Sequence, residues 1–176
     1  MANLQANPWA LTSADVATAA ITAATGLTLN SDGTVTITTT GALTFITANV
    51  PPALWFTVIG ATAAAYNGAY KLLIGASGGT SFTMLPDGFS IPAGTAQSGG
   101  GTLAQCIYPW EVRIEDLSWQ NASAAGQLLD LRDRSGNPLW QATATGAGSQ
   151  NRGKLFWVAG VTPITIQSGV VLATID

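Results

Sequence analysis

The sequence predicts a mostly β protein made of antiparallel sandwich-like or jelly-roll-like units, with one short N-terminal helix. Apolar and polar residues alternate over several short segments, as where Val35 and Ile37 lie between threonines, and this period of two is typical of strands that bury one face. Turns rich in Gly, Ser and Pro separate these segments at intervals of about eight to twelve residues, which is typical of sandwiches and jelly rolls. The 176 residues are enough for one domain or two small ones with a real hydrophobic core.

Residues 1–50 are expected to hold an arm, a short helix and a β-hairpin. Pro8 and Trp9 stand in an otherwise polar start. We therefore interpret residues 1–11 as an extended arm rather than a core element, with a Trp side chain that needs a partner.

A helix is predicted directly after the arm. Thr12 or Ser13 can cap it, alanine-rich spacing continues through Ala24, and Gly26 would supply the left-handed stop. From residue 27 the apolar period changes to two, which predicts antiparallel strands.

Residues 51–105 are expected to form a small β module, and residues 106–176 a C-terminal β-sandwich. The stretch 94–102 has no apolar period and predicts a loop. Hairpin turns are predicted at 134–138 and 167–169, where Gly, Ser, Asn and Pro gather between apolar runs.

The composition excludes several classes of chemistry. Only 6 basic and 9 acidic residues are present, or 9% of the chain, against roughly 25% in an ordinary soluble domain. With no His and one Cys, the chain cannot assemble a Ser-His-Asp triad, a Cys-His pair, a His- or Cys-based zinc site, or an internal disulfide. We expect no cofactor.

The same composition argues against two kinds of partner. No run of Lys or Arg offers an electrostatic footprint for a phosphate backbone, so direct nucleic-acid binding is not expected. Neither a secretory signal nor an apolar stretch of about eighteen residues is present, so we expect a chain made in a cytoplasm, with no membrane partner.

The ionisable groups favour ion pairs over catalysis, so we expect a protein that is not an enzyme. Glu111 and Glu115 would point to the same face of a strand, roughly 13 Å apart, which is too far for the paired carboxylates of glycosidases. Arg113 lies between them and can pair with either. The charged residues at 130–134 flank a turn and are interpreted in the same way, and Cys106 is expected to be a small buried apolar residue.

Aromatic content and low charge together predict contacts with other subunits. In small sandwiches Trp more often fills a core or an interface than a sugar-binding platform, although six Trp residues could also form such a platform. A mean hydropathy of +0.32 with so few charges favours a surface covered by other subunits, since the centre of an interface is poor in charge. A neutral, Thr-rich protein without partners is the alternative.

Two stretches, Phe56 to Tyr70 and Ser77 to Met84, contain in order a strand, an alanine-rich link, a Tyr-Asn-Gly turn, a second strand and a Thr-x-Phe-Thr strand. This order resembles a small β-module recurrent in virion proteins of tailed bacteriophages. The C-terminal stretch, with its Asp-Arg-Ser-Gly-Asn-Pro turn at 133–138, looks like small phage structural proteins built as β-sandwiches.

The resemblance implies a structural virion protein, and a capsid decoration (cement) protein on the outer capsid surface is the expectation we favour. Such families typically sit as trimers over capsomer junctions, so the expected partners are the major capsid protein and copies of the chain itself in a homotrimer. An acidic chain with few lysines also suits the outside of a DNA-filled shell better than the inside. The alternative is a tail, baseplate or fibre component, including a glycan-binding adhesin. The residues expected to contact neighbouring subunits are Pro8, Trp9, Leu11, Trp55, Trp110 and Trp119.

Overall fold

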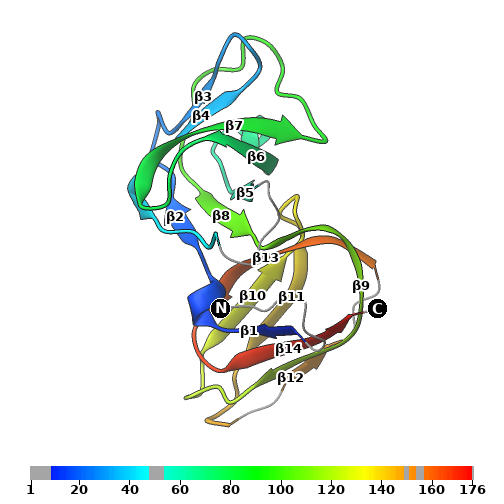
Figure 1. Cartoon of the computed structure of the whole chain (residues 1–176). Helices are drawn as coiled ribbons and strands as arrows, with labels where there is room; N and C mark the ends of the chain where they lie inside the picture. The colour runs from blue at the N-terminus through cyan, green and yellow to red at the C-terminus, as the bar shows by residue number, and fades with distance from the viewer. Residues whose placement is uncertain (1–8, 48–53, 149–150, 154–156, 176) are drawn as a thin grey trace.

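The computed structural model describes residues 9–47, 54–148, 151–153 and 157–175, and these form a mostly β chain with two antiparallel sheets (Figure 1). Each sheet has seven strands in the described part of the chain. The predicted fold class, mostly β with antiparallel sheets in a sandwich-like arrangement, is confirmed.

The sheet that we call the N-terminal sheet has the order β2-β8-β5-β6-β7-β4-β3. Its two ends approach each other, because Ile21 forms a bridge with Thr39 and the Thr22 N–H donates to the Thr38 carbonyl at 2.9 Å. The sheet therefore curls around its own core. Its strands are β2 (Thr18–Ala20), β3 (Leu27–Leu29), β4 (Val35–Leu43), β5 (Trp55–Ile59), β6 (Gly68–Ile74), β7 (Gly79–Asp87) and β8 (Thr102–Cys106), and the 3-10 turn η2 covers Ala64–Tyr66.

The second sheet, which we call the C-terminal sheet, has the order β1-β14-β9-β13-β10-β11, with β12 paired to β9. The chain passes into it at Ile107, between β8 and β9. The predicted turns at 134–138 and 167–169 are confirmed, since they join β10 to β11 and β13 to β14. The strands are β1 (Trp9–Leu11), β9 (Tyr108–Gln120), β10 (Leu128–Arg132), β11 (Pro138–Thr143), β12 (Asn151–Gly153), β13 (Trp157–Ile166) and β14 (Val170–Ile175).

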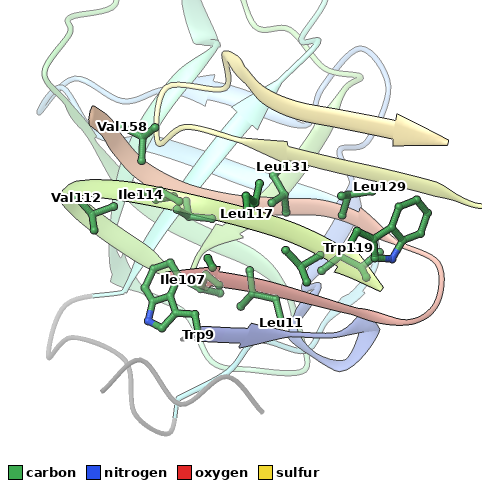
Figure 2. Close-up of a cluster of buried hydrophobic side chains, with 14 of the residues drawn as sticks. Trp9, Leu11, Ile107, Val112, Ile114, Leu117, Trp119, Leu129, Leu131 and Val158 are labelled. Carbon is green, nitrogen blue, oxygen red and sulfur yellow. The ribbon is translucent and has the colours of Figure 1, made fainter. Parts of the chain in front are cut away.

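Each sheet encloses a separate hydrophobic core. The N-terminal core includes the buried aromatics Phe56, Tyr66, Tyr70 and Phe82. The C-terminal core, shown in Figure 2, takes side chains from both ends of the sequence, including Trp9, Leu11, Ile107, Val112, Ile114, Leu117, Trp119, Leu129, Leu131 and Val158.

The predicted N-terminal helix is wrong beyond its first turn. Thr12 does form a capping box with Asp15, whose carboxylate accepts the Thr12 N–H at 2.8 Å, but the helical segment is only the 3-10 turn η1 (Ser13–Asp15). The chain then becomes extended as β2, which pairs with β8. Backbone hydrogen bonds to a neighbouring strand thus override the helical preference of the alanines. Ala24, at φ 64°, takes the left-handed conformation predicted for Gly26.

The described part of residues 1–50 does not form a unit of its own. Residues 9–11 pair as β1 with β14 near the opposite end of the sequence. Residues 18–43 supply three strands to the sheet that also contains β5 to β8. The arm interpretation is therefore wrong for residues 9–11, and residues 1–8 lie outside the described residues.

A polar seam joins the two units. The Thr57 hydroxyl on β5 donates to the Arg134 carbonyl at 2.9 Å and lies 3.0 Å from the Thr162 hydroxyl on β13, with which it shares a hydrogen bond. Both threonines are fully buried. Because buried hydroxyls are costly to leave unpaired, these bonds favour one arrangement of the two sheets.

The Arg134 side chain crosses the same seam. Its Nη1 donates to the Pro109 carbonyl at 3.0 Å and lies 3.5 Å from the Asp87 carboxylate. Its guanidinium carbon is 5.3 Å from the ring centroid of Trp55, a cation–π distance. One side chain thus contacts β7, β5 and the start of β9.

Candidate assembly surface

Large apolar side chains reach the surface on both units. The chain exposes 8033 Å² of surface to solvent. Its whole sequence contains only 15 charged residues. The exposed large hydrophobics are Leu73, Ile74, Leu85, Trp110, Leu128 and Trp157. Single exposed apolar residues are ordinary on soluble proteins, so their grouping matters more than their number.

The first group lies on one hairpin of the N-terminal sheet. Leu73 and Ile74 end β6, and Leu85 lies on the paired strand β7. Ile74 is 69% exposed. The β6–β7 pairing shifts register between Leu72 and Ile74, which breaks the alternation that would otherwise turn one of two consecutive apolar residues inward. We call Leu73, Ile74 and Leu85 the hairpin patch.

Two exposed tryptophans lie on the other unit. Trp157, at the start of β13, is 72% exposed, and Trp110, on β9, is 52% exposed. The Trp110 ring meets the Tyr108 ring edge-on at 5.3 Å, and Tyr108 meets Trp9 in the same way at 4.8 Å. Trp110 is therefore held at the surface by a row of rings that ends in the core.

Three of the six residues expected to contact other subunits lie inside their own chain instead. Trp9, Leu11 and Trp119 are at most 1% exposed and pack in the C-terminal core (Figure 2). In this arrangement their side chains have no surface to offer a partner. The β1–β14 pairing carries Trp9 and Leu11 into the core, a long-range contact that no local pattern indicates.

The other three candidates have different positions. Trp110 is exposed, Trp55 is half-buried at the seam beneath Arg134, and Pro8 lies outside the described residues. Sequence reasoning missed Trp157 and the hairpin patch. The run Leu72, Leu73 and Ile74 was the available signal, because three consecutive apolar residues in a strand cannot all face one core.

Several of the predicted ion pairs are present, while Asp133 accepts hydrogen bonds from Asn137. Arg113 lies 3.7 Å from the Glu115 carboxylate on the exposed face of β9. At the β10–β11 turn, the Arg132 guanidinium lies 3.0 Å from Asp130, and Asp133 accepts the Asn137 backbone N–H at 2.8 Å.

Cys106 is buried, as predicted, at 3% exposure. Burial raises the pKa of its thiol to about 11, since a thiolate would lose its hydration there. Within the described ranges no group of three or more His, Cys, Asp or Glu residues is arranged to hold a metal ion. Over the same ranges, no helix has the length and apolar character needed to cross a bilayer.

A hollow of about 590 Å³ lies at the far end of the N-terminal unit. Its lining includes Leu29, Leu85, Phe89 and Ile91, together with small polar residues, and contains no carboxylate, amine or thiol. It therefore offers an apolar surface without an acid or a base.

In comparisons with known proteins, no protein-family model, curated protein or solved structure matches this chain.

Proposed function

We propose that this chain is a non-enzymatic structural protein of a tailed-phage particle, and specifically a decoration protein that binds the outside of the capsid and other copies of itself. The observation that carries the proposal is the surface of 8033 Å²: it has few charges, and among the described residues the hairpin patch, Trp110 and Trp157 are exposed on it. Such a surface is suited to burial against other subunits.

The exposed side chains are large enough for useful binding energy. Burying the exposed part of Trp157 would contribute on the order of 3 kcal/mol at roughly 25 cal/mol per Å² of apolar area. The hairpin patch and Trp110 lie on other strands, so contacts at several points can act together. Multi-site attachment of this kind stabilises a shell without any chemical step.

The net charge of the chain supports a position on the outer face of the shell. The net charge is −3 with 6 basic residues, so the chain has little to attract packaged DNA and some repulsion from it. The phage assignment itself depends on the order of motifs between residues 56 and 84.

Immunogold electron microscopy tests the proposal directly. Antibody against the chain would be applied to intact particles of a phage that encodes it. Particles of the same phage with the gene deleted are the control. Label distributed over the capsid is expected. Label confined to the tail would favour the alternative below, and particles without label would refute the virion assignment.

A tail, baseplate or fibre component that binds glycans is the second candidate, and the exposed rings of Trp110 and Trp157 favour it. Aromatic faces stack on sugars in many lectins, but neither ring lines the hollow of about 590 Å³ on the N-terminal unit. A glycan array with the W110A and W157A variants as controls tests it. Binding that both variants lose would support an adhesin.

A further inference from the structure

Strand β11 lies at one end of the C-terminal sheet. It pairs with β10 on one side, and no strand in the described part of the chain pairs with it on the other (Figure 1). An open edge presents backbone N–H and C=O groups to any strand that approaches, and natural proteins usually protect such edges with charged side chains, prolines, bulges or a covering segment.

The hydrogen bonds of Ala144 show which residues face the open side. Its N–H donates to the Gln127 carbonyl at 2.9 Å, and its own carbonyl accepts the Gly126 N–H at 2.8 Å. Both backbone groups of Ala144 thus point toward the β10 side. In an antiparallel strand the residues alternate between the two sides, so every second residue before Ala144 points the same way.

By this alternation Trp140 and Ala142 bond to β10, while Gln141 and Thr143 direct their N–H and C=O groups outward. No backbone or side-chain hydrogen bond from another described residue reaches these four outward groups. The side chains of Gln141 and Thr143 are also exposed. Among the described residues, no hydrogen bond therefore occupies the backbone groups of this edge.

The usual protection is missing over most of β11. The strand Pro-Leu-Trp-Gln-Ala-Thr has no charged residue, and its proline, Pro138, is its first residue. The irregularity in the β10–β11 pairing lies between Leu131 and Arg132, at that same end. Residues 140–143 pair regularly with β10, carry no charge and lie at the open edge.

The geometry points to antiparallel pairing of β11 with β11 of a second copy of this chain, about a two-fold axis at Ala142. Ala142 lies between the two outward-facing residues, so an axis there places Gln141 of each copy opposite Thr143 of the other. These are the residues whose backbone groups face outward, and the two pairs form four hydrogen bonds.

A second copy fits this edge for steric and electrostatic reasons. Ala142 meets its own equivalent at the close, non-hydrogen-bonded position, about 4.5 Å between Cα atoms, where a methyl group fits. Trp140 lies opposite the small Ala144. No like charges oppose each other, so the surface is self-complementary, as a two-fold interface requires.

This inference goes beyond the proposed function, because it concerns the chain in isolation. A two-fold pair also differs from the homotrimer that the phage resemblance implies, which would need another surface. If the chain is found on capsids but is monomeric in isolation, the pairing is refuted and the proposed function stands. If the chain dimerises but is absent from particles, the proposed function is refuted and the pairing stands.

The mass in solution is the first test. Sedimentation equilibrium between about 1 and 100 μM should show a species of 35.8 kDa, twice the 17.9 kDa chain. Q141P removes an outward N–H that β10 does not use, and proline is tolerated on such an edge, so this variant should weaken the dimer about tenfold or more. Q141A keeps the N–H and should dimerise normally.

Disulfide cross-linking tests the register. Gln141 and Thr143 of the two copies would have Cα atoms about 5.5 Å apart, within disulfide range, whereas either residue lies about 7–8 Å or more from its own equivalent. An oxidised mixture of Q141C and T143C should therefore give covalent dimer in clear excess over either variant alone. Buried Cys106 is common to every sample and cancels.

The pairing is overturned by a single-chain mass over the whole concentration range, by a larger species that Q141P leaves unchanged, or by cross-linking that the mixture does not increase. Circular dichroism of Q141P shows whether the variant is folded. If it is not, the cross-linking result alone decides.

Discussion

Two tryptophans buried in the same core provide a matched pair for measuring the effect of an indole hydrogen bond. Trp9 and Trp119 are both 0% exposed. The Trp119 indole N–H donates to the Ser168 carbonyl at 2.8 Å, whereas the Trp9 indole N–H is buried with no hydrogen-bond partner among the described residues. Replacing each by phenylalanine removes a similar volume but a different polar group.

The expected costs differ clearly. Trp→Phe removes about two ring carbons, worth roughly 1.6 kcal/mol at about 0.8 kcal/mol per carbon group. At Trp9 the substitution also removes an unpaired buried N–H, whose desolvation costs about 1–3 kcal/mol, so W9F should lie within about 1.5 kcal/mol of the parent. At Trp119 it breaks a hydrogen bond worth about 1 kcal/mol, so W119F should lose about 2.5–3 kcal/mol.

Urea unfolding followed by circular dichroism measures both free energies, and thermal unfolding gives a second reading. At about 2–4 °C per kcal/mol for a chain of this size, the W119F midpoint should lie roughly 5–10 °C below that of W9F. Equal destabilisation by the two variants would refute the reasoning, because the packing loss would then outweigh the hydrogen-bond difference.

Three further predictions follow from the fold. Deleting residues 1–11 should lower the thermal midpoint by 10 °C or more, since it removes the buried core side chains of Trp9 and Leu11, worth about 2–5 kcal/mol each. An unchanged midpoint would contradict the β1 assignment. T57V and T162V should each lower the free energy of unfolding by about 1–3 kcal/mol, and the double variant should lower it by less than their sum. Urea unfolding of the single and double variants measures these values, and full additivity would argue against the Thr57–Thr162 hydrogen bond. Hydrogen bonds from the Thr34 side chain and backbone N–H hold the pKa of exposed Asp32 below its usual value of 3.8. The stability that Asp32 contributes is therefore present above its unfolded-state pKa, and it is lost as pH falls through the lower pKa of the folded state. An NMR titration should show this pKa rising in T34V, and no rise would exclude the hydroxyl as its cause.

Local pattern was sufficient where neighbours in sequence are also neighbours in space. The alternation around Val35 and Ile37 predicted strand β4, and both side chains are buried. The Ser-Gly-Asn-Pro turn predicted the β10–β11 hairpin. The spacing of Arg113 and Glu115 predicted their ion pair on β9. Each of these depends on contacts within a few residues or on one turn.

Local pattern failed where a distant strand decides the outcome. The alanines after Asp15 favour a helix by themselves, but β8 supplies backbone partners about 85 residues further on, and the segment is extended. Trp9 is flanked by Pro8 and Ala10 in a segment interpreted as an arm, yet its strand pairs with β14 and places the ring in the core.

The sequence by itself determined an antiparallel β chain with little charge, no catalytic triad and defined turns, because composition and a period of two are properties of neighbouring residues. Only the tertiary structure decided which tryptophans are buried, that Trp157 and the hairpin patch are exposed, and that β11 ends its sheet with an open edge. Those outcomes depend on strand order, which is set by contacts between residues far apart in the chain.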